Sequence, residues 1–323
     1  MSRALPIRLP QEARSVALAL VAFVVIALLP TIYKQYLVSQ LLLVVAVIDL
    51  AIIWNLIAGF GGQLSLAHAT FFGIGSYAVA IAFTRAWIPV PLALLAGAGA
   101  AALLAIAVTL VTLRFRIRGI YFALVTLAVA LMLRDTAVAS AGLGGSVGIA
   151  LPYGDNALQL QFPTQFPYFY GLIALGFILW VVSRQFVRSR QGIALRAIRD
   201  DEVAAQAIGH SLTTRISVVM AGTAALSAVV GAIYGLGSLQ ASPDVSLGLN
   251  VMFAILVATI IGGIGTSWGP LVGGIVYEGI GVIVSQIPGG TGSLPILLGV
   301  AFGVVLVGIV VLRPEGLLPQ RRS

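Results

Sequence analysis

The sequence predicts an all-α, polytopic integral membrane protein with about 8–10 transmembrane helices, and three observations support this fold class. Hydrophobic residues make up 60% of the 323 residues and charged residues only 9%. A soluble domain has roughly 45–50% apolar residues and about 25% charged residues. Long uncharged runs recur along the chain, and many of its 37 glycines gather in clusters. The chain has no cysteine, which excludes disulfide scaffolds and thiolate metal sites. We expect residues 1–323 to form a single transmembrane domain.

The membrane-spanning helices follow from where charged residues and Gly or Pro clusters interrupt the apolar runs. A hydrocarbon core of about 30 Å needs about 20 helical residues. The span at 251–264 is short, and 119–139 carries Arg134 and Asp135 near one end, so nine and eight spans are alternatives to ten. The ten predicted spans are 15–32, 37–57, 66–84, 89–113, 119–139, 168–187, 215–238, 251–264, 268–287 and 294–312.

The basic residues predict the orientation of these spans. With the N-terminal segment 1–14 inside, all 18 basic residues lie on the inner side except Lys34, Arg85 and Arg134, as the positive-inside rule requires. The net charge of +8 then reflects membrane topology rather than nucleic-acid binding, and the C-terminal segment 313–323 is cytoplasmic as well. No small-residue cleavage site ends the first span, so we expect an uncleaved anchor rather than a signal peptide.

Two segments outside the membrane are long enough to carry function. The outer loop 140–167 has no basic residue and is rich in Gly and Pro, a composition that favours turns. It is either a cap over the outer mouth or a plain connector. The inner loop 188–214 is basic, and the cluster Arg114, Arg116 and Arg118 lies on the same side. These three arginines are topology determinants that also suit contact with a partner protein or anionic lipid.

The residues that known catalytic motifs require are missing. A Walker loop needs a lysine after its glycines, and the only lysine, Lys34, is far from any glycine cluster. The histidines His68 and His210 are too few and too far apart for a metal cluster, and no H-E-x-x-H or G-x-S-x-G arrangement occurs. Transport is therefore favoured over catalysis, without an ATPase site in this chain.

Two glycine clusters predict broken helices, one in each half of the chain. Residues 59–75 read GFGGQLSLAHATFFGIG, and 261–274 read IGGIGTSWGPLVGG. Interrupted helices survive in a membrane where protein or water satisfies the freed backbone, and paired breaks in repeated halves are typical of transport pathways. Close helix packing through small residues is the alternative. The candidate pathway residues are Gly61, Gly62, Gln63, Ser65, His68, Gly263, Gly265 and Thr266.

The inner loop also predicts a short amphipathic helix. Asp200 is the expected N-cap of a helix over 201–208, and Gly209 is expected to close it in a left-handed conformation. So short a helix must be held by other protein. We expect a knob that a partner subunit grips, or else a helix lying on the lipid surface.

Six motifs follow one another along the chain. They are Asn55-Leu56 before GGQLSLAHATFFGIGSY, RGIYFA from Arg118 with Thr126-Leu127-Ala128, GGSVGI from Gly144, Arg190–Gly209, IGGIGT from Ile261 with Gly269-Pro270, and Arg313-Pro314-Glu315-Gly316. In this order they resemble the permease subunits of bacterial branched-chain amino acid ABC importers of the LivM type. The resemblance covers about residues 40–317.

This resemblance implies a heterodimer with a second permease subunit, two cytoplasmic ATPase subunits that hold the ATP and Mg, and a periplasmic substrate-binding protein in a bacterial inner membrane. No cofactor is expected in this chain. Ala67 and Asp49 depart from the family pattern, since glycine usually precedes the histidine and an apolar residue is expected at position 49. The implied ATPase-docking residues are Arg190, Gly192, Arg196, Arg199, Asp200, Glu202, Ala204, Ala205 and Gly209.

Acids inside the membrane leave a second class of function open. Asp49 and Glu278 each cost about 2.5–3.5 kcal/mol on insertion scales, so both need partners or water. A structural hydrogen bond is favoured for Glu278 and a packed role for His68, while Asp49 stays undecided. Together they motivate the alternative of an ion-coupled secondary transporter or channel. Within the importer class, urea, a short amide or another small organic solute is the alternative cargo to an amino acid.

Overall fold

The computed structural model describes residues 11–32, 36–86, 88–152, 154, 156, 159–209, 211–285, 303, 308 and 316–318. Their long helices are α1 (Gln11–Ile32), α2 (Tyr36–Asn55), α3 (His68–Ile81), α4 (Val90–Arg114), α5 (Ile120–Ala139), α6 (Phe166–Arg188), α9 (Leu212–Ser238), α11 (Leu249–Gly262) and α12 (Gly269–Ser285). Shorter helices are α7 (Arg190–Asp200), α8 (Glu202–Ala207) and α10 (Pro243–Ser246), and single turns are Leu56–Phe60 and Ala82–Ala86, both π-helical, and Ala141–Leu143.

The predicted spans correspond to apolar helices wherever the structure describes them. Six helical stretches are long and apolar enough to cross a membrane, and three shorter ones lie at 15–28, 68–84 and 269–282. The span predicted at 251–264 begins earlier, because α10 and α11 together form a stretch of 20 residues, Pro243–Gly262. The predicted span 294–312 falls almost wholly outside the described residues. The chain is thus an all-α, multi-pass membrane protein.

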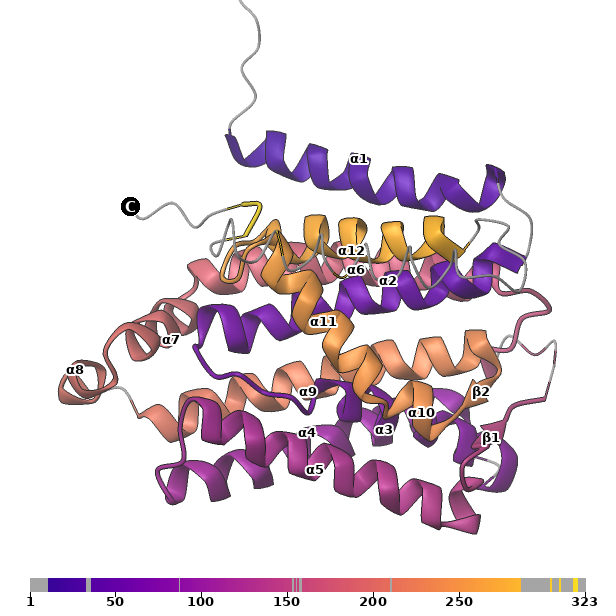
Figure 1. Cartoon of the computed structure of the whole chain (residues 1–323), viewed down its shortest axis with the longest axis horizontal. Helices are drawn as coiled ribbons and strands as arrows, with labels where there is room; N and C mark the ends of the chain where they lie inside the picture. The colour runs from indigo at the N-terminus through magenta and orange to yellow at the C-terminus, as the bar shows by residue number, and fades with distance from the viewer. Residues whose placement is uncertain are drawn as a thin grey trace, which may run out of the picture.

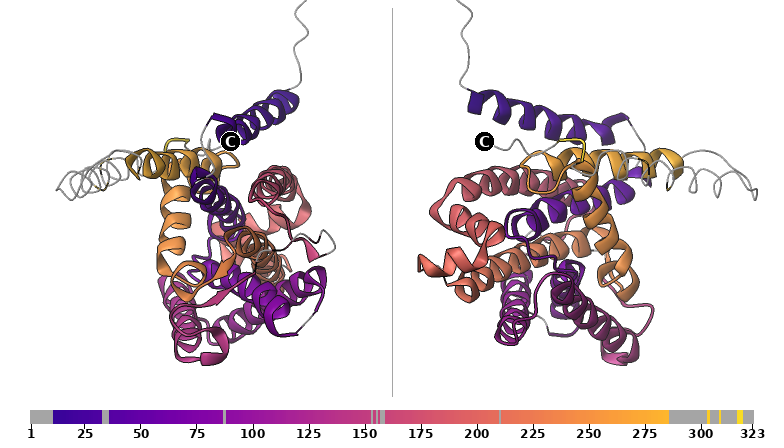
Figure 2. Two further views of the ribbon diagram at one scale, coloured as in Figure 1. Left: turned by 90° about the vertical axis from the view of Figure 1, so that its right-hand side faces the viewer. Right: turned by 60° about the vertical axis from the view of Figure 1, so that its left-hand side comes forward.

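The helices lie roughly side by side, with α7 and α8 at one end of the bundle and the short strands β1 (Ile149–Ala150) and β2 (Gln240–Ala241) at the other (Figure 1). Helix α1 lies at one edge and α4 and α5 at the opposite edge, while α11 crosses the bundle obliquely, as the turned views also show (Figure 2). The inner loop and the outer loop of the sequence analysis therefore lie at opposite ends.

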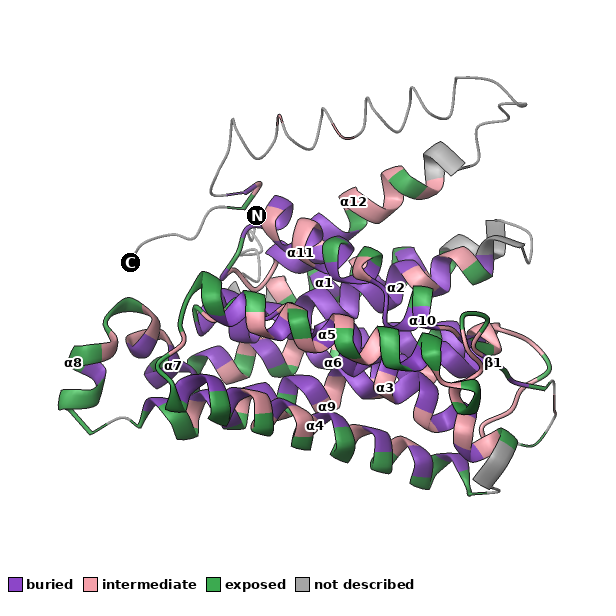
Figure 3. Cartoon of the chain, turned by 60° about the horizontal axis from the view of Figure 1, so that its bottom comes forward, coloured by how far each residue is buried: buried purple, intermediate pink, exposed green. Residues whose placement is uncertain are grey.

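Burial identifies α2 as the central helix. Its apolar window over Val38–Phe60 is 94% buried, whereas those of α4 and α5 are only 22% and 28% buried. Figure 3 shows exposed residues recurring along the outward side of α4. A helix that is apolar all round suits a protein interior, and exposed apolar residues on a peripheral helix suit contact with lipid. Helix α2 therefore lies in the interior, in contact with α6, α9, α11 and α12.

Small residues bring α3 and α9 into backbone contact. A side chain at Gly75 would overlap the carbonyl of Ala228, and one at Gly231 would overlap the carbonyl of Phe72. Such close approach is a common way for helices to associate in membranes. Gly73 and Gly75 thus lie within the continuous helix α3, so the prediction that they help to interrupt it was wrong.

The outer loop 140–167 is fixed to the rest of the bundle at several points. Strand β1 pairs antiparallel with β2, with Ile149 opposite Ala241. Gln159 accepts a hydrogen bond of 3.0 Å from the amide of Val90 at the start of α4. At the same end Arg134 forms an ion pair of 2.7 Å with Asp244. The strand pairing and the bond to Gln159 give the loop a defined position at this end of the bundle.

Candidate functional site

The first glycine cluster does interrupt a helix, between α2 and α3. The interruption, here called the first break, comprises residues 56–67: the π-helical turn Leu56–Phe60 and an irregular segment, 61–67. Gly62 has φ +68°, in the left-handed region that favours glycine. Single π-helical turns within α-helices are frequent at functional sites.

Hydrogen bonds from neighbouring helices satisfy the freed backbone of this segment. Trp54 Nε1 donates to the carbonyl of Ser65 at 2.7 Å, and Thr126 Oγ1 of α5 accepts from the amide of Leu66 at 2.9 Å. The amide of Gln63 donates back to the carbonyl of Ile57 at 3.1 Å. Irregular backbone at membrane depth requires such protein partners, so the first break is a built feature of the fold.

The second glycine cluster also contains an interruption, which is shorter. The second break, residues 263–268, is a tight turn between α11 and α12 in which Gly263 and Gly265 have φ of +115° and +76°. Thr266 Oγ1 donates to the carbonyl of Gly263 and accepts from the amide of Gly269, both at 2.9 Å. Trp180 of α6 donates from Nε1 to the carbonyl of Ser267 at 2.8 Å.

One side chain joins the two breaks. Asn55, only 1% exposed, donates from Nδ2 to the carbonyl of Thr266 at 2.9 Å and accepts at Oδ1 from the amide of Gly265 at 2.8 Å. A Cβ on Gly59 would lie 2.6 Å from the Gly265 nitrogen, so the backbones touch there. We call this contact the junction. From the sequence, Asn55 was predicted only to be part of a family motif. The sequence feature that could have indicated its role is an amide side chain at the end of a long apolar run.

The inner loop attaches to the first break through α7. Arg199 donates from Nη1 to the carbonyl of Gly59 at 2.8 Å, and a Cβ on Gly62 would lie 2.6 Å from Arg199 Cγ. Leu195, on the same helix, is fully buried and lies beside Gly61. Of the predicted pathway residues, Gly62 thus lies beside the predicted docking residue Arg199, and Gly61 lies beside Leu195. Helix α7 is in direct contact with the first break.

The inner loop contains two helices rather than the single one predicted. Ser189 caps α7 by accepting from the amide of Gly192 at 3.3 Å. Asp201 caps α8 by accepting from the amide of Ala204 at 3.0 Å. Asp200 is instead the last residue of α7, and its carboxylate lies 3.0 Å from Arg199 Nη2, so the predicted cap at Asp200 was wrong. Gly209 has φ +90°, as predicted for the residue that closes the helix.

Helix α8 projects beyond the bundle (Figure 1). Val203 and Ile208 are 77% and 73% exposed, and Ala204 is exposed too, while Ala205 packs inward. Glu202 holds the helix to the turn after α4 through an ion pair of 2.6 Å with Arg118. Arg190 is exposed at the start of α7, and Arg196 donates to the carbonyl of Val187 at 3.2 Å. The result is an apolar knob on a charged base.

The other predicted pathway residues lie just beyond the junction. Ser65 and His68 are fully buried, and the His68 ring packs edge-on against Phe71 with centroids 5.5 Å apart. Gln63 is half-buried. Among the described residues, neither the His68 nitrogens nor Gln63 Oε1 has a hydrogen-bond partner. Polar atoms of the first break and of the first residue of α3 are thus without a hydrogen-bond partner among the described residues.

The membrane acids occupy different places. Asp49 is fully buried on α2, against Gly176 of α6 and Phe23 of α1, with no hydrogen-bond partner in the described part of the chain. Glu278 is half-buried on α12. Asp49, His68 and Glu278 thus sit on three different helices, and Asp49 and His68 have different neighbours. Residue 210 and Lys34 lie outside the described residues.

A cavity of about 930 Å³ adjoins the second break. It is lined by Thr266, Ser267 and Trp268 of the turn, by Arg184 and Arg188 of α6 and by apolar residues such as Leu18 of α1. Arg184 lies over the Trp180 ring, 5.5 Å from its centroid, and Trp180 packs against Trp268. Space therefore exists beside the second break at the same end of the bundle as α7 and α8.

Comparison with known proteins agrees with this architecture. The chain is 26% identical over 297 residues to the high-affinity branched-chain amino acid transport system permease protein LivM of Salmonella typhimurium. The match covers 83% of this chain and 66% of that protein, so the chain spans just under two thirds of its relative's length. No solved structure matches. The family model for the permease component of branched-chain amino acid transport systems matches residues 36–312, and the chain therefore belongs to that family.

Proposed function

We propose that this chain is the permease subunit of an ATP-driven importer, forming with a second permease the pathway for branched-chain or other small apolar amino acids. The observation that carries the proposal is the link from α8, through α7 and Arg199, to Gly59 at the junction. A knob with exposed Val203 and Ile208 suits docking to another protein, because burying apolar surface drives association. Motion of a docked partner would then reach the junction directly.

The partners in this proposal are the second permease, two cytoplasmic ATPase subunits and a periplasmic substrate-binding protein. The sequence supports it, because a chain without a Walker lysine needs its ATP and Mg to be held elsewhere. The charge distribution supports an inner-membrane location with the α7–α8 end and both termini in the cytoplasm. The family description supports an amino-acid cargo.

Reconstitution tests the function as a whole. Proteoliposomes that contain this chain, the partner permease, the ATPases and the binding protein should take up leucine only with ATP. Uptake that persists without ATP contradicts the importer. Transport by this chain alone, collapsing with the proton gradient, would instead identify the secondary transporter, and uptake of urea in place of leucine would correct only the cargo.

The docking surface has its own test. Val203→Asp and Ile208→Asp should abolish co-purification of the ATPases, because a buried unpaired charge is costly. Val147→Asp is the matched control, since Val147 is 73% exposed at the opposite end of the bundle. Glu202→Ala should weaken association by a smaller factor through loss of the Arg118 ion pair. Normal co-purification of both aspartate variants would place the ATPases elsewhere.

A further inference from the structure

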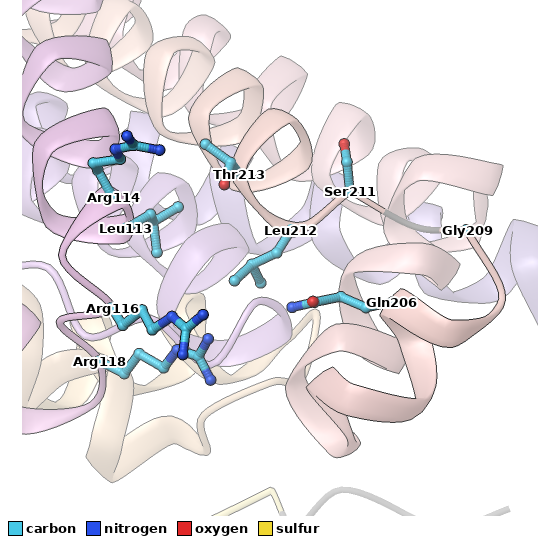
Figure 4. Close-up of a pocket in the computed structure, with 9 residues that line it drawn as sticks. All are labelled: Leu113, Arg114, Arg116, Arg118, Gln206, Gly209, Ser211, Leu212 and Thr213. Atoms are coloured by element: carbon cyan, nitrogen blue, oxygen red, sulfur yellow. The ribbon is translucent and has the colours of Figure 1, made fainter.

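A basic cavity lies between the turn that follows α4 and the start of α9, beside α8 (Figure 4). Its volume is about 550 Å³, and its lining includes Arg114, Arg116, Arg118, Gln206, Ser211 and Thr213. In Figure 4 the Arg116 and Arg118 side chains extend toward Gln206, and Arg114 lies near Thr213. None of the described residues that line the cavity is acidic. The cavity therefore combines positive charge with amide and hydroxyl groups.

Two of the three arginines are available to a ligand. Arg118 is paired with Glu202, but Arg114 and Arg116 are exposed and form no ion pair within the described part of the chain. The 27-residue helix α9 begins at the rim, and Ser211 makes no side-chain cap there. Free amide groups and the helix dipole add to the attraction for an anion.

The backbone holds Arg116 in an unfavourable conformation. Helix α4 ends in a Schellman motif, in which the amides of Ile117 and Arg116 donate to the carbonyls of Thr112 and Leu113 at 2.9 and 3.1 Å. Arg116 occupies the left-handed position of this motif, with φ +55°, where glycine is usual. Non-glycine residues in such positions concentrate at functional sites. An arginine at this position points to use of its charge.

An apolar cavity adjoins the basic one. It measures about 450 Å³ and is lined by Leu110, Val111 and Phe115 together with Arg114 and Thr213, which line both cavities. Leu110, Val111 and Phe115 are 45%, 56% and 72% exposed. The groove runs beside α4 and α9, two of the candidate membrane spans. A ligand that fills both cavities has an anionic head and an apolar tail.

We propose that these two cavities bind one anionic glycerophospholipid from the surrounding membrane. The headgroup phosphate would lie among Arg114, Arg116 and the start of α9, and an acyl chain would lie against Val111 and Phe115. Basic pockets between membrane helices bind such headgroups. A free phosphate or nucleotide has no acyl chain to fill the apolar cavity. The lipid would contact Gln206 of α8 and the Arg118–Glu202 pair, and so stabilise the position of the knob.

Native mass spectrometry of the full chain in detergent tests this proposal. The probes are palmitoyl-oleoyl phosphatidylglycerol, phosphatidylcholine with the same chains, and inorganic phosphate. We expect phosphatidylglycerol to be retained and phosphatidylcholine not, with Arg116→Gly lowering the phosphatidylglycerol affinity about fivefold. Glycine suits the turn, so the melting temperature should not fall. The double variant Arg114→Gln with Arg116→Gly should lower the affinity for phosphatidylglycerol about 25-fold.

Two further variants separate lipid from other ligands. Arg190→Gln removes a charge from the same end of the bundle but outside both cavities, and it should leave lipid retention unchanged. Phe115→Ser should weaken phosphatidylglycerol binding without creating phosphate binding. Equal retention in Arg116→Gly and Arg190→Gln, or equal retention of phosphatidylcholine, would overturn the proposal. Competition by inorganic phosphate at equal concentration, with Phe115→Ser unaffected, would identify a free-anion site instead.

Discussion

The first break extends over residues 56–67 and is bonded to α5 and α7. The second break, residues 263–268, is a shorter turn that has two hydrogen bonds of its own Thr266 in addition to those from α2 and α6. The first is bonded to α7 through Arg199, and the second is bonded to α6 through Trp180. Asn55 ties one to the other. Two segments that look alike in sequence are thus attached to different parts of the molecule, and the first is the one bonded to the inner loop through Arg199.

This difference suggests a division of labour within the proposed transporter. The first break has an irregular backbone whose supporting groups come from other elements, so a shift of α7 can change it. The second break is shorter, has internal hydrogen bonds from Thr266 and is bonded to α2 and α6, so we expect it to move less. Four substitutions test this comparison, from the largest expected effect on stability to the smallest.

Asn55→Leu should destabilise the protein most, because it removes the contact that both breaks share. The Gly265 amide and the Thr266 carbonyl would lose their buried partner, at roughly 2–5 kcal/mol in total. The measurement is thermal unfolding of the purified protein in detergent. Asn250→Leu is the control, since Asn250 is exposed at the start of α11. Equal melting temperatures for the two variants would mean that the breaks are held together by other contacts.

Gly59→Ala should cost about 1–3 kcal/mol, because the added methyl group pushes the two breaks apart. Its Cβ would meet the Gly265 backbone at 2.6 Å. Gly99→Ala on α4 has open space around it and should be neutral or stabilising by up to about 1 kcal/mol. Chemical denaturation in mixed micelles compares the pair, and an unaffected Gly59→Ala would show that the junction has room to relax.

Thr266→Val should cost about 1–2 kcal/mol, since the hydroxyl group makes two hydrogen bonds within the second break. Ser65→Ala in the first break should cost clearly less, because the amide of Ala67 is 3.4 Å from Ser65 Oγ. Melting temperatures of the two variants test whether a side chain within the break contributes more to stability in the second break than in the first. The reverse order of stability would refute that distinction.

Arg199→Gln should change global stability by less than about 1 kcal/mol, because Arg199 is a partly exposed side chain. Its effect should be local: faster amide hydrogen exchange in residues 56–62 and no change in 263–268. Arg196→Gln, a charge change in the same helix that loses only a bond to Val187, is the control. Matching exchange profiles for the two variants would argue against a special link between α7 and the first break.

Transport measurements should also distinguish Arg199→Gln from Arg196→Gln. In the reconstituted importer, Arg199→Gln should retain ATPase association yet lower uptake about tenfold, within the 0.5–2 kcal/mol typical of coupling residues. Arg196→Gln keeps the bond between Arg199 and Gly59 and should lower uptake less than Arg199→Gln does. An undiminished rate in Arg199→Gln would leave docking in place but remove this route of coupling.

Much of this molecule follows from its sequence, because in a membrane the backbone must be helical wherever lipid surrounds it. Apolar runs therefore predicted the helices, and Gly62, Gly263 and Gly265 marked positions where positive φ ends them. The inner loop was recognised from its charge and from the closing glycine, Gly209. From the sequence, Asp200 and Asp201 are equally suitable N-cap residues. In the structure Asp201 is the N-cap of α8, because Asp200 is the last residue of α7 and pairs with Arg199.

Only the tertiary structure decided which distant segments meet. Asn55 and Gly265 are 210 residues apart, and no periodicity or cap rule encodes a contact of that range. Packing likewise assigned Gly73 and Gly75 to helix contact and Gly59 to the junction, although all three belong to one glycine-rich run. Hydrophobic pattern fixes which residues leave water, but it is the complementary shapes and hydrogen bonds of whole helices that select their neighbours.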